Sequence, residues 1–315
     1  MKNKSLQAWV LSVLFLSSAI VSCSSGDGSM DEPSGGSSSG TTSGSIPENT
    51  DSGNNNNSAP DNIKPDNTGN GGDTESGNEW QLRFEDNFDT NDSIPDTQYW
   101  TLTPRGTDTW NRHMSESYAQ AYQKDGYLYL FGMLVNGEYL TGGIETRNKF
   151  DFTYGQVKCR ARFLRHPQGN HTGIWMMPEP PAEKWPRSGE IDIMEHLDSE
   201  DLVYETVHYY DTATQENASS HATAEIDQED FNVYGIIWDK ENVTFTLNGE
   251  SVFSYKNNNP EDSEFSYQYP FTKPFYLILS QSLGGKGTWE GEINNEQLPA
   301  IFQIDWIKVW QKTEN

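Results

Sequence analysis

Short runs in which apolar and polar residues alternate fill the chain after residue 79, and no convincing helical period interrupts them. Such runs cover residues 127–134, 155–164, 205–210, 234–239, 275–281 and 302–310. Two further runs, 243–247 and 252–255, flank Asn248-Gly249, a dipeptide that suits the type I′ turn of a β-hairpin. This pattern predicts an all-β fold, a two-sheet antiparallel sandwich. Several runs have one apolar side and one aromatic or polar side, which predicts a concave, solvated groove on one sheet.

One strand-like stretch, residues 188–196, carries the carboxylates Glu190, Asp192 and Glu195 between apolar residues. Glu190 and Asp192 share a face because side chains alternate along a strand. Strict alternation would send Glu195 to the opposite face. One extra residue in a β-bulge near Ile193-Met194 would return it to the shared face, and bulges often re-aim side chains beside active sites.

With such a bulge the two glutamates lie about four strand steps apart, roughly 13 Å between Cα atoms. Side chains that lean inward can narrow this to the ~5–5.5 Å carboxyl separation of a retaining glycosidase. Glu190 would then be the nucleophile and Glu195 the general acid. Three carboxylates this close cannot all ionise freely, so repulsion should raise at least one apparent pKa of the cluster and keep a proton on the acid.

Two other interpretations of these carboxylates stay open. The first is that they are ordinary solvated carboxylates without a function. The chain has a net charge of −26, and its acidic pairs such as Glu229-Asp230 are typical of solvated loops. The cluster at 190–195 differs because it interrupts an apolar strand, where charges are costly. A calcium site is the main rival, although the spacing and the glycine of an EF-hand are missing.

The charge also limits the partners that we expect. A net charge of −26 argues against nucleic acid, whose binding depends on clustered Lys and Arg, and against adhesion to anionic lipid. Neutral glycans remain compatible with it. A glycine-rich phosphate loop and paired zinc-ligand spacings are both missing from the sequence.

Composition divides the chain into three parts. Residues 1–22 carry two lysines and then an apolar run, as in a secretory signal peptide. Ile20-Val21-Ser22-Cys23 is similar to a bacterial lipoprotein cleavage box, which implies a lipid on Cys23; a signal peptide cut nearby is the alternative. Residues 23–78 are rich in Ser, Gly and Asn, and this composition predicts a flexible tether. Residues 79–315 would form one catalytic domain.

We therefore expect a protein secreted across the inner membrane and lipid-anchored at the outer membrane or the cell surface. The anchor would be its only contact with the membrane, and the protein would be a monomer. Once Cys23 carries a lipid, Cys159 is the only cysteine left, so an intrachain disulfide is impossible. The alternation around Cys159 predicts a buried thiol.

Aromatic side chains are further candidates for the groove, because their rings stack on the apolar faces of sugars. Tryptophan is also common in cores, so its neighbours decide between the two roles. Four tryptophans lie near Gly, Pro or charged residues, and we expect them in the groove: Trp110, Trp175, Trp185 and Trp289.

The segment Gly189-Glu-Ile-Asp-Ile-Met-Glu195 resembles the active-site signature of glycoside hydrolase family 16, in the bulged form typical of laminarinase-like members. The resemblance covers most of residues 80–312, with matching segments at 84–88, 139–146, 154–157, 174–178, 206–208, 284–285 and 304–310. It implies a β-jelly-roll sandwich and a retaining endo-mechanism that needs no cofactor. Glu190 would be the nucleophile, Glu195 the acid/base and Asp192 the assisting carboxylate.

The same resemblance implies a set of substrate-binding residues. The segment Trp110-Asn111-Arg112 matches one that lines the glycone subsites, with Trp110 as a stacking platform and Arg112 as a hydroxyl ligand. Trp175 matches the aromatic residue on the floor near the reacting sugar. His208 matches a histidine near the acid/base, and a purely structural histidine is the alternative.

Two assignments from the resemblance are less direct. Gln281 and Trp289 would face the groove. Many relatives hold a structural calcium ion on the convex side, and in this chain it would fall near Glu85, Gly126 and Asp305. Those three residues also suit ordinary turns.

One segment departs from the family pattern. Laminarinases usually have Gly-x-Trp-Pro-Ala-x-Trp where this chain has Gly169-Asn-His-Thr-Gly-Ile-Trp175, so a tryptophan and its proline are absent and His171 stands close by. A histidine can bind an axial hydroxyl, as galactose presents. Relatives include endo-β-galactosidases, agarases and enzymes that act on mucin-type O-glycans.

The expected function is therefore an endo-β-glycosidase that cleaves internal β-1,3 or β-1,4 linkages of an extracellular glycan. The substrate would be a laminarin-like or mixed-linkage β-glucan, or a galactose-containing chain such as poly-lactosamine or a mucin O-glycan. A surface lipoprotein that binds glycans without cutting them is the alternative from another class.

Overall fold

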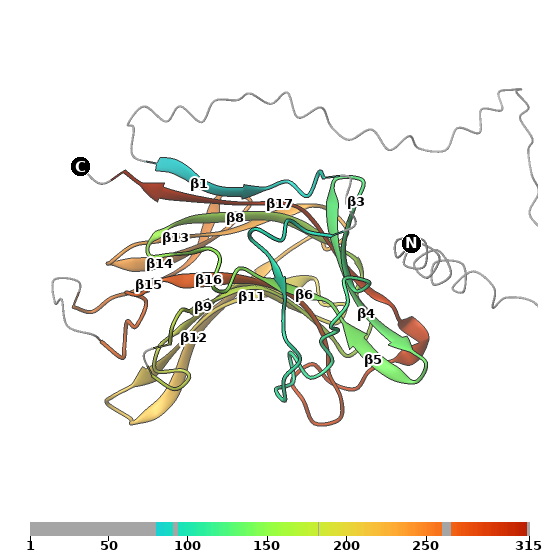
Figure 1. Cartoon of the computed structure of the whole chain (residues 1–315). Helices are drawn as coiled ribbons and strands as arrows, with labels where there is room; N and C mark the ends of the chain where they lie inside the picture. Colours follow the sequence, from blue (N-terminus) through green and yellow to red (C-terminus); the bar gives the residue numbers. More distant parts are fainter. Residues whose placement is uncertain (1–79, 91–93, 182, 260–265, 314–315) are drawn as a thin grey trace, which may run out of the picture. The chain divides into compact units, whose positions relative to one another are not determined.

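The computed structural model describes residues 80–90, 94–181, 183–259 and 266–313. Within these ranges the chain forms two antiparallel β-sheets and one short 3-10 helix, η1 (Asn295–Gln297), with no α-helix (Figure 1). The predicted all-β sandwich is confirmed. No helix in the described ranges is long and apolar enough to cross a membrane. The expected signal peptide, Cys23 and the whole of the expected tether lie outside the described residues.

The first sheet contains β1 (Trp80–Asp86), β3 (Ala121–Lys124), β4 (Tyr127–Val135), β5 (Glu138–Thr141), β8 (Gly155–Arg165), β13 (Asn232–Trp238), β14 (Asn242–Leu247), β15 (Glu250–Lys256) and β17 (Ala300–Lys312). Its order is β15-β14-β13-β8-β17-β4-β3, with β1 on β17 and β5 on β4. The turn between β14 and β15 is Asn248-Gly249, with positive φ at both residues, as a type I′ turn requires. The predicted hairpin is confirmed.

The second sheet contains β2 (Thr101–Leu102), β6 (Gly143–Glu145), β7 (Asp151–Phe152), β9 (Asn170–Pro178), β10 (Glu190–Leu197), β11 (Leu202–Asp211), β12 (Glu216–Glu225) and β16 (Phe275–Leu283). Its order is β12-β11-β10-β9-β16-β6-β2, with β7 on β16. Figure 1 shows this sheet curving so that its concave side faces away from the first sheet. The groove predicted from the sequence belongs to this side.

The hydrophobic core lies between the two sheets and follows the alternation of the strands. On β8 the inward residues Val157, Cys159, Ala161 and Phe163 are all buried, whereas the residues between them are half-buried. The thiol of Cys159 is thus in the core, as predicted, and burial raises its pKa. Each large apolar side chain removed from water in this way stabilises the fold by roughly 1.5–3 kcal/mol.

One inward position is occupied by a carboxylate. Glu205 lies on β11 between Val203 and Val207, which pack in the core, and it is fully buried. Neither of its carboxylate oxygens has a hydrogen-bond partner among the described residues. Burial raises the pKa of Glu205 to about 8, because the surroundings disfavour the charged form.

This burial makes the stability depend on pH. The folded protein keeps the Glu205 proton up to a higher pH than the unfolded chain does, so unfolding releases a proton between pH ~4.5 and about 8. The free energy of unfolding should therefore fall as the pH rises through this window, by on the order of 4 kcal/mol in total. Glu205→Gln should remove this contribution to the pH dependence. The free energy of unfolding of the variant, relative to that of the parent, should therefore rise from pH 4 to pH 8.

Urea unfolding of parent and variant at pH 4, 6 and 8 measures the effect. Glu216→Gln, at an exposed glutamate of the neighbouring strand β12, is the matched control for the change in net charge. A difference between the Glu205 variant and the parent that does not change with pH would contradict the assignment.

Candidate active site

The three carboxylates lie on β10, whose register shifts against both neighbouring strands. Asp192 and Met194 pair with consecutive residues of β9, so Ile193 is one extra residue on β10. This is the β-bulge expected near Ile193-Met194, and it is confirmed. It returns Glu195 to the face that carries Glu190 and Asp192, and all three line one cavity.

Core packing holds the bulge in place. Ile191, Ile193 and Met194 are fully buried and belong to the core between the sheets. Residues 193 and 194 are consecutive and both point into the core, which regular alternation does not allow. Turning either side chain toward the groove would expose an apolar surface worth roughly 1.5–3 kcal/mol.

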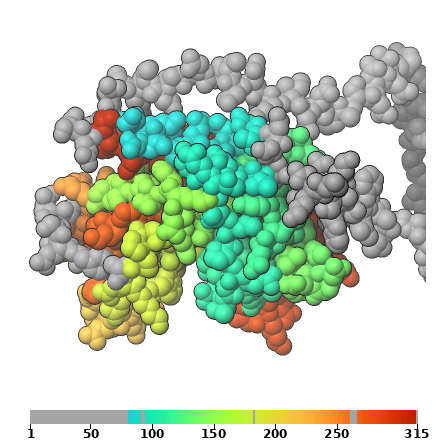
Figure 2. All heavy atoms as spheres, in the orientation of Figure 1, coloured from blue at the N-terminus to red at the C-terminus, as the bar shows by residue number. Residues whose placement is uncertain are grey.

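The cavity on the concave side has a volume of about 450 Å³. Segments from four parts of the chain line it around the three carboxylates: Thr107, Asp108, Thr109, Trp110, His171, Gly173, Trp175, Ser280, Trp289 and Glu290. Figure 2 shows an indentation where the teal segment around residues 100–115 meets the yellow-green strands. No Lys or Arg belongs to the described lining, whereas five carboxylates do.

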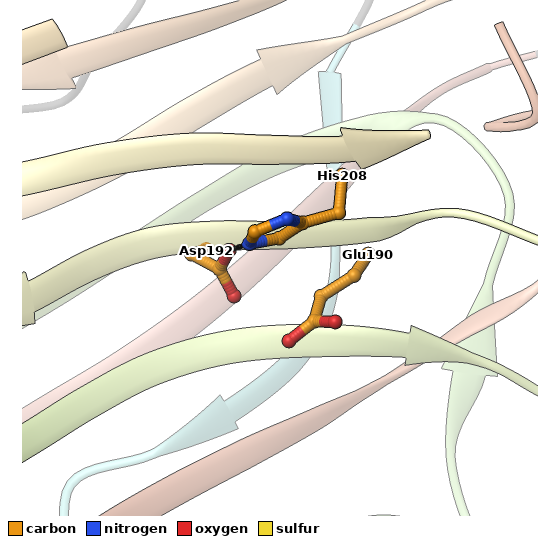
Figure 3. Close-up of side chains that lie close together, drawn as sticks. All are labelled: Glu190, Asp192 and His208. Carbon is orange, nitrogen blue, oxygen red and sulfur yellow. Dashed lines mark ion pairs between the residues drawn. The ribbon is translucent and has the colours of Figure 1, made fainter. Parts of the chain in front are cut away.

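Glu190, Asp192 and His208 lie close together on β10 and β11 (Figure 3). His208 Nε2 lies 3.2 Å from Asp192 Oδ2, and the indole N–H of Trp185 donates to Glu190 Oε2. Potential ligand atoms of the three residues lie within 4.8 Å of one another, so they are the group in the described chain that comes nearest to a divalent-cation site. The pairing of Asp192 with His208 already accounts for the position of the imidazole.

Burial and mutual repulsion govern the protonation of the Glu190 and Asp192 carboxyls. Burial raises the pKa of Glu190 well above its usual range, and the charge of Asp192 raises it further. Burial likewise raises the pKa of Asp192, with the charge of Glu195 as the next cause. The Glu190–Asp192 pair therefore holds a proton more readily than two isolated carboxyls do, and its titration belongs to the pair.

His171 contacts the third carboxylate. Its Nε2 lies 3.1 Å from Glu195 Oε1, and the imidazole is almost fully buried. Its Nδ1 is enclosed and has no hydrogen-bond partner among the described residues. The ring of Trp289 lies against the imidazole, with 5.4 Å between the ring centroids. Nε2 is thus the atom through which His171 acts on the pocket.

Aromatic rings form the floor and the walls. Trp110 and Trp175 meet edge to face, with 4.6 Å between their ring centroids, and the Trp175 N–H donates to Ser280 Oγ over 3.0 Å. This contact fixes the orientation of the floor ring. Trp185 and Trp289 are 49% and 55% exposed, so their faces remain open to a ligand. All four tryptophans expected in the groove lie at or beside the cavity.

Asn111 and Arg112 are not among the residues that line the cavity, contrary to the expectation that they contact the sugar. Asn111 is buried and accepts a hydrogen bond from the backbone of Asp108, and the Arg112 guanidinium donates to the carbonyl of Gly284. Both side chains are occupied in holding loops. Residues 107–110, which do line the cavity, gain their position from these contacts.

Gln281 also lies away from the cavity, because it follows Ser280 on β16 and alternation turns it toward the other side of the sheet. It is buried, accepts from Thr172 and donates to backbone carbonyls that include that of His171. The expectation that Gln281 faces the groove is therefore wrong. Its hydrogen bonds instead tie β16 to β9.

The residues expected near a calcium ion have other partners. Glu85 pairs with Lys308 over 2.6 Å, and the Asp305 carboxylate pairs with Arg160. Gly126 lies in the turn between β3 and β4, with φ 78°. Both carboxylates would have to give up a basic partner before they could coordinate calcium. These residues as they lie do not fit the ion, and the calcium site stays a prediction.

Sequence reasoning missed several residues of the cavity, among them Asp108, Ser280 and Glu290. Glu290 directly follows Trp289, and Asp108 lies two residues before Trp110. This proximity to tryptophans expected in the groove is the one available signal. Nothing else distinguishes them from the many solvated carboxylates of an acidic chain. Only the convergence of two distant loops over β10 brings them together.

Comparison with known proteins agrees with this arrangement. Residues 106–308 match the glycosyl hydrolases family 16. A keratan-sulfate endo-1,4-beta-galactosidase of Sphingobacterium multivorum is 36% identical over 242 residues, which are 74% of this chain and 56% of that protein. The chain thus matches little more than half of that relative's length.

Two other relatives match over most of their length. A beta-glucanase of Rhodothermus marinus is 29% identical over 254 residues, 75% of this chain and 86% of that protein. A solved structure, from work on endo-acting O-glycanases with which members of the human gut microbiota initiate mucin breakdown, has a TM-score of 0.66 and 30% identity, over 73% of this chain and 98% of that one. The chain belongs to glycoside hydrolase family 16, as its sequence predicted.

Proposed function

We propose that the protein is a retaining endo-β-glycosidase that hydrolyses internal linkages of a galactose-containing chain. The observation that carries this proposal is the bulge of β10, which aims Glu190, Asp192 and Glu195 into one cavity walled by aromatic rings. A retaining glycosidase needs one carboxylate as nucleophile and another as acid/base on the same face. A merely structural strand has no reason to keep three carboxylates beside one another.

In the first step Glu190 attacks the anomeric carbon while Glu195 protonates the leaving oxygen, so the glycosidic bond breaks as an ester to Glu190 forms. Glu190 must be ionised to attack. The indole N–H of Trp185 donates to Glu190 and stabilises that charge. His208, beside Asp192, would help to orient the carboxyl.

In the second step Glu195, now a carboxylate, takes a proton from water. The water attacks the anomeric carbon, the ester to Glu190 breaks, and the configuration is retained. His171 contacts Glu195 through Nε2, and we assign it to hold this carboxyl in position through both steps. Trp175 would support the apolar face of the reacting sugar.

Two observations favour galactose as the sugar at the cleaved position. The first is the position of His171, where laminarinases usually place a tryptophan: an imidazole is smaller and leaves room beside Glu195 for an axial hydroxyl. The second is the likeness to the Sphingobacterium endo-galactosidase, at 36% identity, against 29% for the Rhodothermus beta-glucanase. Poly-lactosamine and mucin O-glycans are the corresponding substrates.

A β-glucanase is the second candidate, favoured by the match over 86% of the Rhodothermus enzyme. Glycan binding without hydrolysis is the alternative of another class. From the sequence we further propose that Cys23 carries a lipid and that residues 23–78 tether the domain at the outer membrane or the cell surface, as a monomer.

Replacement of the nucleophile separates hydrolysis from binding. Glu190→Gln should lower kcat by at least about 10³-fold, because the amide cannot form the ester, while oligosaccharides still bind. Reducing-sugar release and calorimetric titration measure the two quantities, and Glu225→Gln, at an exposed glutamate of β12, is the matched control. Equal rates in variant and parent would refute the role of Glu190, and a parent without hydrolysis would favour the binding protein.

The charge of Asp192 should set the acidic limb of the pH profile. Asp192 raises the pKa of Glu190, and attack requires the ionised Glu190. Asp192→Asn removes that charge, so the acidic limb of kcat/KM should move to lower pH, together with a lower maximal rate. Asp89→Asn, at an exposed aspartate, controls for net charge. A limb that stays in place, or moves to higher pH, would show that Asp192 does not act on Glu190.

A panel of polysaccharides decides between the two sugars. Incubated with the purified protein, poly-lactosamine and mucin O-glycans should release oligosaccharides of several sizes, the pattern of an endo-acting enzyme, and chromatography sizes the products. Laminarin and barley glucan should be cut slowly or not at all. Release from the glucans with none from poly-lactosamine would rule out the galactose assignment.

A further inference from the structure

Glu290 is a buried carboxylate in the wall of the cavity to which the proposed steps give no task. Its side chain is 5% exposed and lines the cavity beside Trp289. Its Oε2 is enclosed and has no hydrogen-bond partner among the described residues. A carboxylate buried in this way costs free energy unless something donates to it.

The electrostatic surroundings of Glu290 increase that cost. The cavity is also lined by Asp108, Glu190, Asp192 and Glu195, and the described lining contains neither Lys nor Arg to balance them. A structural role would pair the carboxylate with a cation or with backbone N–H groups, as Glu85 pairs with Lys308. Because it lacks such partners among the described residues, we expect the buried Glu290 carboxylate to contribute little to the stability of the fold.

The loop that carries Glu290 is held in a defined position. Arg112 donates to the carbonyl of Gly284, and the backbone N–H groups of Gly284 and Gly285 donate to Gly169 and Gly291 over 2.8 and 2.7 Å. A Cβ atom at Gly284 would lie 2.6 Å from Glu290 Cβ, so the close approach of the chain requires glycine there. The carboxylate is thus fixed in the wall before a ligand arrives.

An ionised carboxylate only accepts hydrogen bonds, so its ligand must supply donors. Because Oε2 is enclosed, only one carboxylate oxygen can meet a ligand in the cavity, and one hydroxyl of a sugar ring is a matching donor. Rotation about the last bond of the side chain exchanges the two oxygens, so one of them faces the cavity while the other stays enclosed. The exposed ring of Trp289, the adjacent residue, offers a surface for the apolar face of the same sugar.

We propose that Glu290 is a substrate-specificity residue, which accepts a hydrogen bond from a hydroxyl of the sugar in this cavity and reads the position of that hydroxyl. The proposal rests on the proposed function and adds to it a recognition group on a different loop from the catalytic strand. Hydrogen bonds to charged groups are strong, and removing one changes affinity by about 10- to 100-fold.

Binding is best measured in the Glu190→Gln background, where a bound oligosaccharide stays intact. The probes are tetrasaccharides of the poly-lactosamine and the laminarin chain, titrated by calorimetry. A second change, Glu290→Gln, should weaken binding of the preferred probe by about 10-fold or more. The matched control is Glu292→Gln, an exposed glutamate two residues further along, which should leave the affinity unchanged.

Thermal unfolding separates binding from a structural role. Because Glu290 is an unpaired carboxylate among other carboxylates, Glu290→Gln should leave Tm unchanged or raise it while affinity falls. Probes that lack one ring hydroxyl locate the contact. Removal of the hydroxyl that Glu290 binds should weaken binding to the Glu190→Gln protein, and should weaken it less once Glu290→Gln is also present, because an amide oxygen is a weaker acceptor than a carboxylate.

The outcomes distinguish the two levels of the proposal. If neither tetrasaccharide binds the Glu190→Gln protein and the parent cuts neither chain, the proposed function and this inference fall together. If the parent cuts a chain and the Glu190→Gln protein binds its tetrasaccharide, but Glu290→Gln changes neither affinity nor KM, this inference alone is overturned. If Glu290→Gln lowers Tm as well as the affinity, Glu290 has a structural role, and this inference is overturned.

Discussion

The burial of Ile193 and Met194, two consecutive residues of one strand, is the constraint on which the site depends. A regular strand would turn one of them to the groove and Glu195 to the core. Because both are fixed in the core, the strand gains one residue against its neighbours and Glu195 emerges beside Glu190 and Asp192. The hydrophobic effect, acting on two apolar side chains, thereby orients the carboxylates on the opposite face.

The carboxylates gathered in this way repel one another, and the site contains groups that manage the repulsion. His208 lies beside Asp192, His171 beside Glu195, and the indole N–H of Trp185 donates to Glu190. Each carboxylate of β10 thus has one partner of its own. The raised pKa values of Glu190 and Asp192 indicate that these partners do not fully offset burial. Such strain is typical of functional sites, where stability is given up for reactivity.

Two loops close the cavity over the strand, and one side chain joins them. Arg112 follows the lining segment 107–110 and donates to the carbonyl of Gly284, at the start of the loop that carries Trp289 and Glu290. Arg112 could bind a sugar hydroxyl, but in this chain it holds the two loops that form the walls of the cavity. The opening between the walls is therefore set by contacts behind the cavity, and its chemistry by the side chains on its surface.

The sequence by itself determined the all-β sandwich, the hairpin at Asn248-Gly249, the bulge and the shared face of the three carboxylates. These features follow from local alternation, from turn residues and from a short motif, which are all readable over a few neighbouring positions. Tertiary structure decided the rest. Asn111, Arg112 and Gln281 proved to hold loops and strands, because a polar side chain takes whichever partner the fold brings near. Glu290 and Asp108 entered the cavity because two loops, distant in sequence, converge over β10, and local pattern carries no record of such long-range contacts.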